Sequence, residues 1–376
     1  MNNDNDSHGY PLKSRLSVVR QELGWHKRSL LRRWLGHHAE PNSWEALAAY
    51  RGLIQQAWGT KPLSPNILSD LWHNGAFHNP TDRPAFFNPA SREREASSHH
   101  YGHDVQIKRH AGLPLIGRPL PFLLEHGLKV SRHAQFETPR HWAKGGYLCM
   151  GQQRALWLQD RFGCKAYAIG PWIQYAQSLL TSTDLQQVKQ ELGRTLLVIL
   201  AHSWDRVSRS MDAEECVSEV SQIAASSHYQ TVIWLRHWQD PTNLPLPTHW
   251  IQACNGHRSN PWFLDALHTL MELSDGLASN AFGTHIGYAA CMDLELHWMN
   301  SAAHEDRSLL PSEQEQRARQ EWEERARLSE ELAHVLSKYG HKPSKNPHLI
   351  QLLNPFWGFD HVQSRQSLRK ILTSGG

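Results

Sequence analysis

A chain of 376 residues is too long for one ordinary hydrophobic core, so we expect two domains. Hydrophobic residues make up 40% of it and charged residues 20%, which suits a globular protein, and no apolar run approaches the ~18–20 residues of a membrane-spanning helix. These values argue against an integral membrane protein and a disordered chain, and the net charge of +3 favours no class of partner.

The cellular location follows from the first residues and from the cysteines. The opening MNNDNDSHGYP has no apolar segment, so it does not form a secretory signal. The five cysteines are odd in number and show no CxxC spacing, which is typical of reduced thiols. We therefore predict a cytoplasmic protein.

The N-terminal region, 1–94, is predicted to be a helical extension. Residues 12–36 place leucines at helical spacing with Lys and Arg between them, and such a basic amphipathic helix can lie on an anionic membrane. A peripheral contact with the inner membrane is one interpretation, and a helix packed on the protein's own body is the other. Residues 79–100 are rich in Pro, Ser and Asn and indicate a loop.

Residues 95–185 read as a first α/β domain. Short apolar runs that end in Gly, His or Pro predict three strands with a helix between the second and third. The predicted strands are 119–126, 145–151 and 165–173, and the predicted helix is 152–162. A hinge is expected near 176–193.

Residues 186–305 read as a second α/β domain, in which strands and helices alternate without interruption. The run RTLLVILAHS (194–203) is apolar throughout, as in a parallel strand buried on both faces. Such alternation predicts a doubly wound parallel sheet. The predicted strands are 194–203, 229–238, 249–256, 276–280 and 294–298, and the predicted helices are 211–227, 260–275 and 281–293. C-terminal helices are expected over 306–376, a long charged one at 312–337 and one or two short ones at 346–373.

The stretch ASNAFGTHIG (278–287) stands where the fourth of these strands ends and a helix begins. The first N–H groups of a helix lack internal partners and lie at the positive end of its dipole, so they suit a phosphate. Gly283 leaves room for the phosphate, while Ser279, Asn280 and Thr284 offer hydrogen-bond donors. An ordinary helix cap, which also uses Ser and Asn, explains the same residues equally well.

Two other strand ends carry polar residues. His202, Ser203 and Asp205 follow the first strand of this domain, and His257 and Arg258 follow the third. The carboxyl ends of parallel strands meet at one edge of a sheet, which is where open α/β sheets bind ligands. Three converging strand ends favour a site more strongly than one.

The first domain offers candidates for acid–base chemistry. Glu125 and His126 end its first predicted strand, and either could act as a general base; a histidine that only hydrogen-bonds its loop is the alternative. Histidines cluster in 99–112, but no acidic or cysteine ligand lies at a standard spacing, so we predict no metal. Lys108 and Arg109 are expected to face an anion.

Several motifs are missing from the sequence. It contains no GxxxxGK[ST], no GxGxxG after a strand and no GxSxG, which argues against P-loop enzymes, ordinary dehydrogenases and α/β-hydrolases. Basic and aromatic residues do not interleave as in RNA-binding modules, so no nucleic-acid partner is expected.

Four segments, spread over about residues 95–300, carry a family resemblance. Together they resemble bacterial glycosyltransferase-like proteins of the GT-B fold, which are associated with capsule and lipopolysaccharide assembly. The segments are YGHDVQIKRHAGLPLIGRPLPFLLEHG (101–127), MGQQRALWLQDRFGCKAYAIGPWIQYA (150–176), LLVILAHSWDRV (196–207) and GHRSNPWFLDALHTLMELSDGLASNAFGTHIGYA (256–289).

This resemblance implies two Rossmann-like domains that face a cleft. The second domain would hold a nucleotide-sugar donor, and the first a saccharide or lipid-linked saccharide acceptor. His126 would face the sugar, with Glu125 and Asp205 as the other catalytic candidates. The donor residues implied are His257, Arg258, Ser279, Asn280, Gly283 and Thr284. His202, Ser203 and His285, in the same predicted strand-end segments, are further donor candidates. The acceptor side would include Tyr101, Asp104 and Lys108.

The leading hypothesis is a metal-independent glycosyltransferase that acts on surface-polysaccharide precursors and needs no cofactor. Helix N-termini and basic side chains would offset the charge of the leaving group without a metal ion. A nucleotide-sugar epimerase on the same fold is the first alternative. A non-catalytic carbohydrate-binding or assembly protein is the second.

Overall fold

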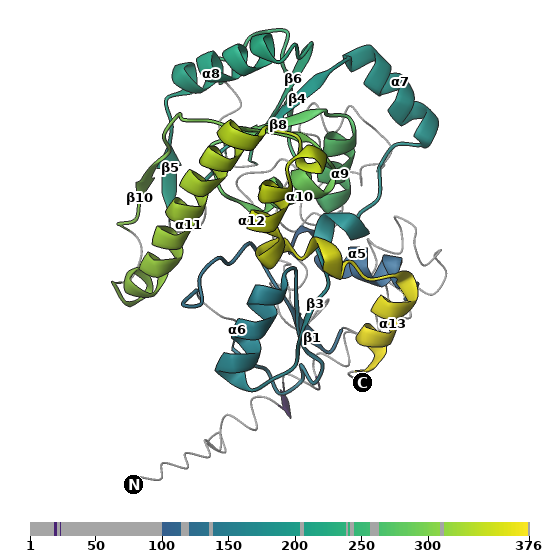
Figure 1. Ribbon diagram of the computed structural model, residues 1–376. Coiled ribbons are helices and arrows are strands. Elements are labelled where there is room, and N and C mark those ends of the chain that lie inside the picture. The colour runs from purple at the N-terminus through teal and green to yellow at the C-terminus, as the bar shows by residue number, and fades with distance from the viewer. Residues whose placement is uncertain are drawn as a thin grey trace.

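The computed structural model describes Val19, Arg20, Leu23 and residues 100–374, except 114–119, 135–137, 204–206, 238–239, 241–243, 256–262 and 309–311. The predicted membrane-binding helix at 12–36 therefore lies, apart from three residues, outside the described part of the chain. The described residues form two parallel sheets with helices packed on them, so the predicted α/β class is confirmed (Figure 1).

The smaller sheet has three parallel strands in the order β1-β2-β3. They are β1 (Phe122–Leu124), β2 (Gly146–Cys149) and β3 (Ala166–Ala168). Helix α6 (Gln152–Phe162) joins β2 to β3 and covers one face, where Leu123, Cys149 and Leu158 pack together. Strand β3 is shorter than the predicted 165–173, because Gly170 turns the chain at a positive φ of 83° into the 3₁₀ helix Trp172–Tyr175.

The larger sheet has five parallel strands in the order β7-β6-β4-β8-β9. They are β4 (Thr195–Val198), β6 (Thr231–Leu235), β7 (Ile251–Ala253), β8 (Gly276–Ser279) and β9 (Glu295–Trp298). In β4, Leu196 and Val198 face helix α8 (Ala213–Ser226), and Leu197 faces α9 (Phe263–Glu272) and α10 (Thr284–Cys291). Burial on both faces explains the unbroken apolar run.

Three elements were absent from the sequence-based prediction of this region. Helix α7 (Ser182–Leu192) occupies the predicted hinge, and Thr181 caps it by accepting a 3.2 Å hydrogen bond from the Asp184 amide. Strands β5 (Ser208–Ser210) and β10 (His304–Asp306) pair antiparallel into a two-stranded ribbon beside the sheet.

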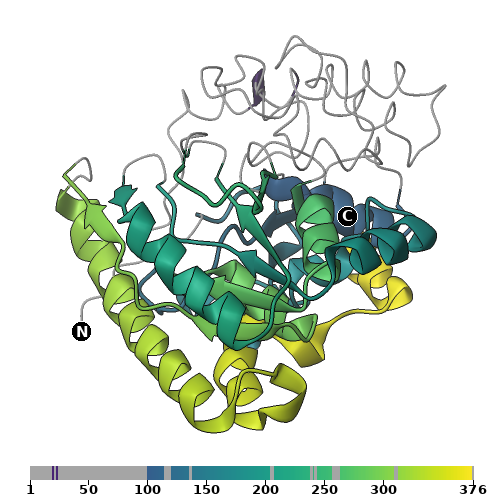
Figure 2. The same ribbon diagram turned by 90° about the horizontal axis from the view of Figure 1, so that it is seen from above.

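The C-terminal helices connect the two sheets. They are α11 (Ser312–Tyr339), α12 (Pro347–Trp357) and α13 (Arg365–Ser374), and α5 (His103–His110) packs against α13. Helix α11 runs along the outside of the molecule and packs on β9 (Figure 2), and α12 contacts both α6 and α10. Trp357 of α12 is fully buried, and its ring lies so close to Gly287 of α10 that a Cβ there would meet it at 2.2 Å. One continuous core thus runs from β1 and β2 through α12 to the face of the larger sheet.

Candidate functional site

The strand order of the larger sheet defines one special position at its carboxyl edge. The chain builds outward from β4 to β6 and β7, then returns to the other side of β4 for β8 and β9. The connections that leave β4 and β8 therefore diverge, and open α/β sheets bind ligands at such a topological switch point. The residues that follow β4 and β8 form the loops 199–203 and 280–283.

The loop after β8 ends at the start of a helix. Gly283 is the N-cap of α10, with extended backbone (φ −122°, ψ 178°), so a helix follows β8 as predicted but begins three residues after the predicted 281. The imidazole of His285 lies over this glycine, and a Cβ on Gly283 would meet its ring at 2.7 Å. Ser279 is fully buried, and its hydroxyl is 2.8 Å from Nε2 of His285. These two side chains set the shape of the turn.

The charge state of His285 follows from its surroundings. Burial first, and then the neighbouring His202, lower the pKa of His285 to about 3. The imidazole is therefore neutral near pH 7, and positive potential at this turn comes from the N-terminus of α10 and from nearby arginines.

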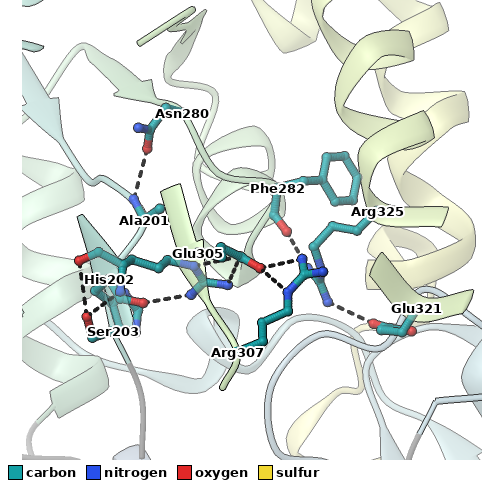
Figure 3. A network of polar contacts seen from close by, with 10 residues as sticks. Ala201, His202, Ser203, Asn280, Phe282, Glu305, Arg307, Glu321 and Arg325 are labelled. Atoms are coloured by element: carbon teal, nitrogen blue, oxygen red, sulfur yellow. Dashed lines mark hydrogen bonds and ion pairs between the residues drawn. The ribbon is translucent and has the colours of Figure 1, made fainter. Parts of the chain in front are cut away.

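Asn280 joins three loops at the same edge. Its Oδ1 accepts a hydrogen bond from the Ala201 amide at 2.9 Å (Figure 3). Its Nδ2 donates to the Ser301 carbonyl at 3.0 Å. Those loops follow β4, β8 and β9. The amide side chain thus holds the loops at a fixed separation, and its hydrogen bonds here go to the protein.

The loop after β4 is held by the ribbon strand β5. Arg209 donates to the carbonyl of His202 at 2.6 Å, and its amide donates to Ser203 Oγ at 2.8 Å (Figure 3). Glu305 of β10 accepts hydrogen bonds from Arg209 at 2.8 Å and from Arg307 at 3.0 Å. His202 itself remains exposed beside the switch point.

Sequence reasoning missed two residues at the end of β6. Arg236 is only 2% exposed and donates to the Asp240 carbonyl at 3.0 Å. His237 stacks on His202, with ring centroids 4.4 Å apart. The predicted strand 229–238 ran through both residues; the change from the apolar run TVIWL to the polar pair Arg236 and His237 was the available signal.

The first sheet uses its strand-end carboxylate internally. Glu125 is 4% exposed, accepts a hydrogen bond from the Met150 amide at 2.8 Å and lies 3.7 Å from the Arg154 guanidinium. Burial, followed by the negative charge of Glu125, raises the pKa of Tyr288 in α10. His126 is half-buried and stacks on Tyr101, with centroids 5.3 Å apart, and Tyr101 packs on Phe263 of α9. This strand end thus lies against helices of the larger sheet.

The other residues predicted on the acceptor side lie in α5. Asp104 and Lys108 are buried, at 0% and 1% exposure. The anion that Arg109 faces is the carboxylate of Asp265 in α9, to which it donates at 2.6 and 3.0 Å. Acceptor contact by Asp104 and Lys108 stays a prediction, and Asp205, His257 and Arg258 lie outside the described residues.

The described part of the chain contains neither a candidate metal-binding group nor a candidate membrane-spanning helix. Among these residues no group of three or more His, Cys, Asp or Glu side chains could hold a metal ion, and the absence of a metal stays a prediction. Within the same residues, no helix combines the length and the apolar character needed to cross a bilayer.

Comparisons with known proteins give weak structural likenesses, among them the two described here. No protein-family model matches the sequence, and no curated protein matches it. An S. aureus MnaA–UDP co-structure aligns over 72% of this chain and 77% of its own, with a TM-score of 0.35 and 9% identity. Phytolacca americana UGT2, complexed with UDP-2-fluoro-glucose and pterostilbene, aligns over 61% of this chain and 50% of its own, with a TM-score of 0.28 and 13% identity. Likeness at this level carries no argument about function.

Proposed function

We propose that this chain binds a nucleotide-activated sugar at the carboxyl edge of the larger sheet and transfers the sugar to a surface-polysaccharide acceptor. One observation carries the proposal: the strand order β7-β6-β4-β8-β9 brings the loop after β4 and the start of α10 to the switch point of a parallel sheet. In this view the first N–H groups of α10 bind the donor's phosphates.

The environment of the two strand-end loops supports a metal-independent reaction. The loop after β4 is fixed by Arg209, and the turn before α10 is bound by Arg325. Fixed positive groups beside a phosphate stabilise a leaving diphosphate, the role that a metal ion has in other enzymes. Each arginine also pairs with a carboxylate, Arg209 with Glu305 and Arg325 with Glu321, so the proposed leaving-group site is already ordered.

The base that accepts the proton of the acceptor hydroxyl is assigned to His126. Glu125, the adjacent candidate, is buried and bound by the Met150 amide and Arg154. His126 is half-buried beside Tyr101, and an imidazole changes its charge close to neutral pH. We therefore assign Glu125 to the folded framework and His126 to the chemistry.

A ligand screen tests the binding half of the proposal. The full-length protein would be melted with CMP, CDP, UDP, GDP and their sugars, and a ligand at ~100 times its Kd should raise the free energy of unfolding by about 2.7 kcal/mol. No shift with any of these compounds would contradict the proposed site.

A turnover assay on the compound that binds tests the reaction. Transfer of the sugar to a saccharide acceptor supports the transferase. Inversion of a sugar carbon without any acceptor would identify an epimerase, and binding without turnover would identify a non-catalytic protein. Replacing His126 by Gln should lower kcat with little change in nucleotide affinity, since His126 faces the acceptor side.

A further inference from the structure

Two side chains of α11 are bound to each other and to loops of both sheets. Glu321 and Arg325, four residues apart on the helix, form an ion pair at 2.8 Å. The Arg325 guanidinium also donates to the Phe282 carbonyl (Figure 3). At 2.9 Å it donates to the Leu128 carbonyl as well. One planar cation thus binds the backbone of both loops.

Glu321 holds the loop of the smaller sheet from the other side. Its carboxylate accepts hydrogen bonds from the Val130 amide at 3.0 Å and from the Ser131 amide at 2.7 Å. The residue is 8% exposed, so water competes little for these bonds. Charge-assisted hydrogen bonds of this kind are about twice as strong as neutral ones.

The two loops that Arg325 contacts lie next to residues of the proposed site. Leu128 follows the strand end of β1 by a few residues, after Glu125 and His126. Phe282 immediately precedes Gly283, the N-cap of α10. Arg325 therefore connects the loop that carries the proposed base with the turn that begins the proposed phosphate site.

We infer that Arg325 is a positioning residue, which sets the distance between the phosphate-binding turn at Gly283 and the loop of His126; this inference rests on the proposed function. Arginine suits the role because its rigid, planar fork donates in several directions at once, whereas a lysine ammonium is a compact point charge on a flexible stem. Glu321 holds that fork in place through the ion pair. The nucleotide meets the turn but not Arg325 itself.

The same chain offers matched controls. Arg327 lies on α11 two residues further on, is about half exposed and pairs only within the helix, with Glu324 and Glu331 at 2.7 Å each. Leu332 is fully buried on α11, so Leu332→Ala destabilises the fold without removing any contact of Arg325 or Glu321. We call these contacts, which join the loops at Leu128–Ser131 and Phe282, the clamp. Arg327→Gln therefore controls for loss of charge, and Leu332→Ala for loss of stability.

The experiment compares Arg325→Gln, Arg325→Lys, Glu321→Gln and the two controls in the full-length protein. One readout is the Kd of whichever of CMP, CDP, UDP and GDP binds the wild type most tightly. The other is amide hydrogen exchange of residues 128–131 and 283–286. For Arg325→Gln we expect the Kd to rise about tenfold and exchange in both segments to accelerate about tenfold. Arg325→Lys should recover only part of either effect, and Glu321→Gln should act mainly on 128–131.

The outcomes separate this inference from the proposed function. If Arg325→Gln leaves Kd and exchange at 283–286 unchanged, or if Leu332→Ala raises Kd as much, the positioning role is overturned and the nucleotide site stands. If the wild type binds no nucleotide, the proposed function falls. Amide hydrogen exchange then tests the contacts of Arg325 alone. Faster exchange at 128–131 and 283–286 in Arg325→Gln, but not in Arg327→Gln, supports these contacts. Equal exchange in the two variants overturns them.

Discussion

The two sheets are built from the same strand–helix units, yet their carboxyl edges differ. Strands β1, β2 and β3 lie in chain order, so no pair of connections diverges. In the larger sheet the order turns back at β4, and the loops after β4 and β8 run apart. The comparison shows that strand order, more than strand sequence, decides which edge stays available for a ligand.

The packing at the two edges follows this difference. At the smaller sheet, α12 closes on the start of α6 so tightly that a Cβ on Gly151 would lie 2.3 Å from the Pro355 carbonyl, and the polar strand end Glu125 is buried. At the larger sheet, His202 remains exposed, and a Cβ on Gly283 would meet only the side chain of His285. One edge is part of the core, and the other has the features of a site.

Removing the side chain that joins the two regions should have the largest effect. Trp357 is fully buried, packs on Gly287 and donates to the Thr284 carbonyl at 3.1 Å. Trp357→Ala should lower the free energy of unfolding by about 3–5 kcal/mol, measured by urea titration. Leu156→Ala, at a site 48% exposed on α6, is the control and should cost far less. A small loss for Trp357→Ala would mean that the two regions do not depend on this contact.

A substitution at Glu125 tests whether the smaller edge is framework. Glu125→Gln keeps the size of the side chain but removes the charge opposite Arg154, so the free energy of unfolding should fall by about 1–3 kcal/mol. The Kd for nucleotide should stay within about twofold, because Glu125 lies on the smaller sheet, away from the proposed nucleotide site. A twofold change in Kd corresponds to less than about 0.5 kcal/mol. A variant with full stability and no turnover would instead make Glu125 catalytic.

Bulk at Gly283 tests the larger edge. The β-carbon of Gly283→Val would meet the His285 ring at 2.7 Å, and because this ring ends a side chain it can move aside. We expect the free energy of unfolding to fall by about 1 kcal/mol and nucleotide binding to be lost, measured by denaturation and calorimetry. Normal nucleotide binding by this variant would show that the Ser-Asn-x-x-Gly-Thr stretch only caps α10 and binds no phosphate.

At neutral pH the smallest effect concerns the charge of His285, and this effect grows as the pH falls. The pKa of His285 is lowered from 6.5 to about 3 by burial and His202, so between these values the unfolded chain binds more protons than the folded one. Stability should therefore rise with pH across this window, by at most ~1.4 kcal/mol per pH unit from this residue, and be lost as pH falls. His285→Gln should flatten that slope in urea titrations between about pH 4 and pH 6, whereas His304→Gln, at an exposed position, should not. An unchanged slope in His285→Gln would show that the imidazole titrates normally in the fold.

Local patterns predicted many elements closely. The helix predicted at 152–162 is α6 to the residue, and the strand predicted at 276–280 is β8 with one residue less. These segments are set by periodicity and by Gly at their ends, which act over a few neighbours. Helix α7 was missed although Thr181 and Asp184 have the spacing of a helix cap, because its apolar residues are few (Leu185, Val188 and Leu192) and none of its residues is fully buried.

The sequence by itself thus determined the α/β class, the buried parallel strands and the helix that follows β8. Tertiary structure alone decided the strand order, the enclosure of Glu125 by Met150 and Arg154, and the contact of Arg325 with Phe282. That contact joins residues 43 positions apart in the chain, and the one between Glu321 and Val130 joins residues 191 apart. No local pattern encodes such pairs, because they form only when two sheets and a C-terminal helix pack together and each buried charge needs a partner.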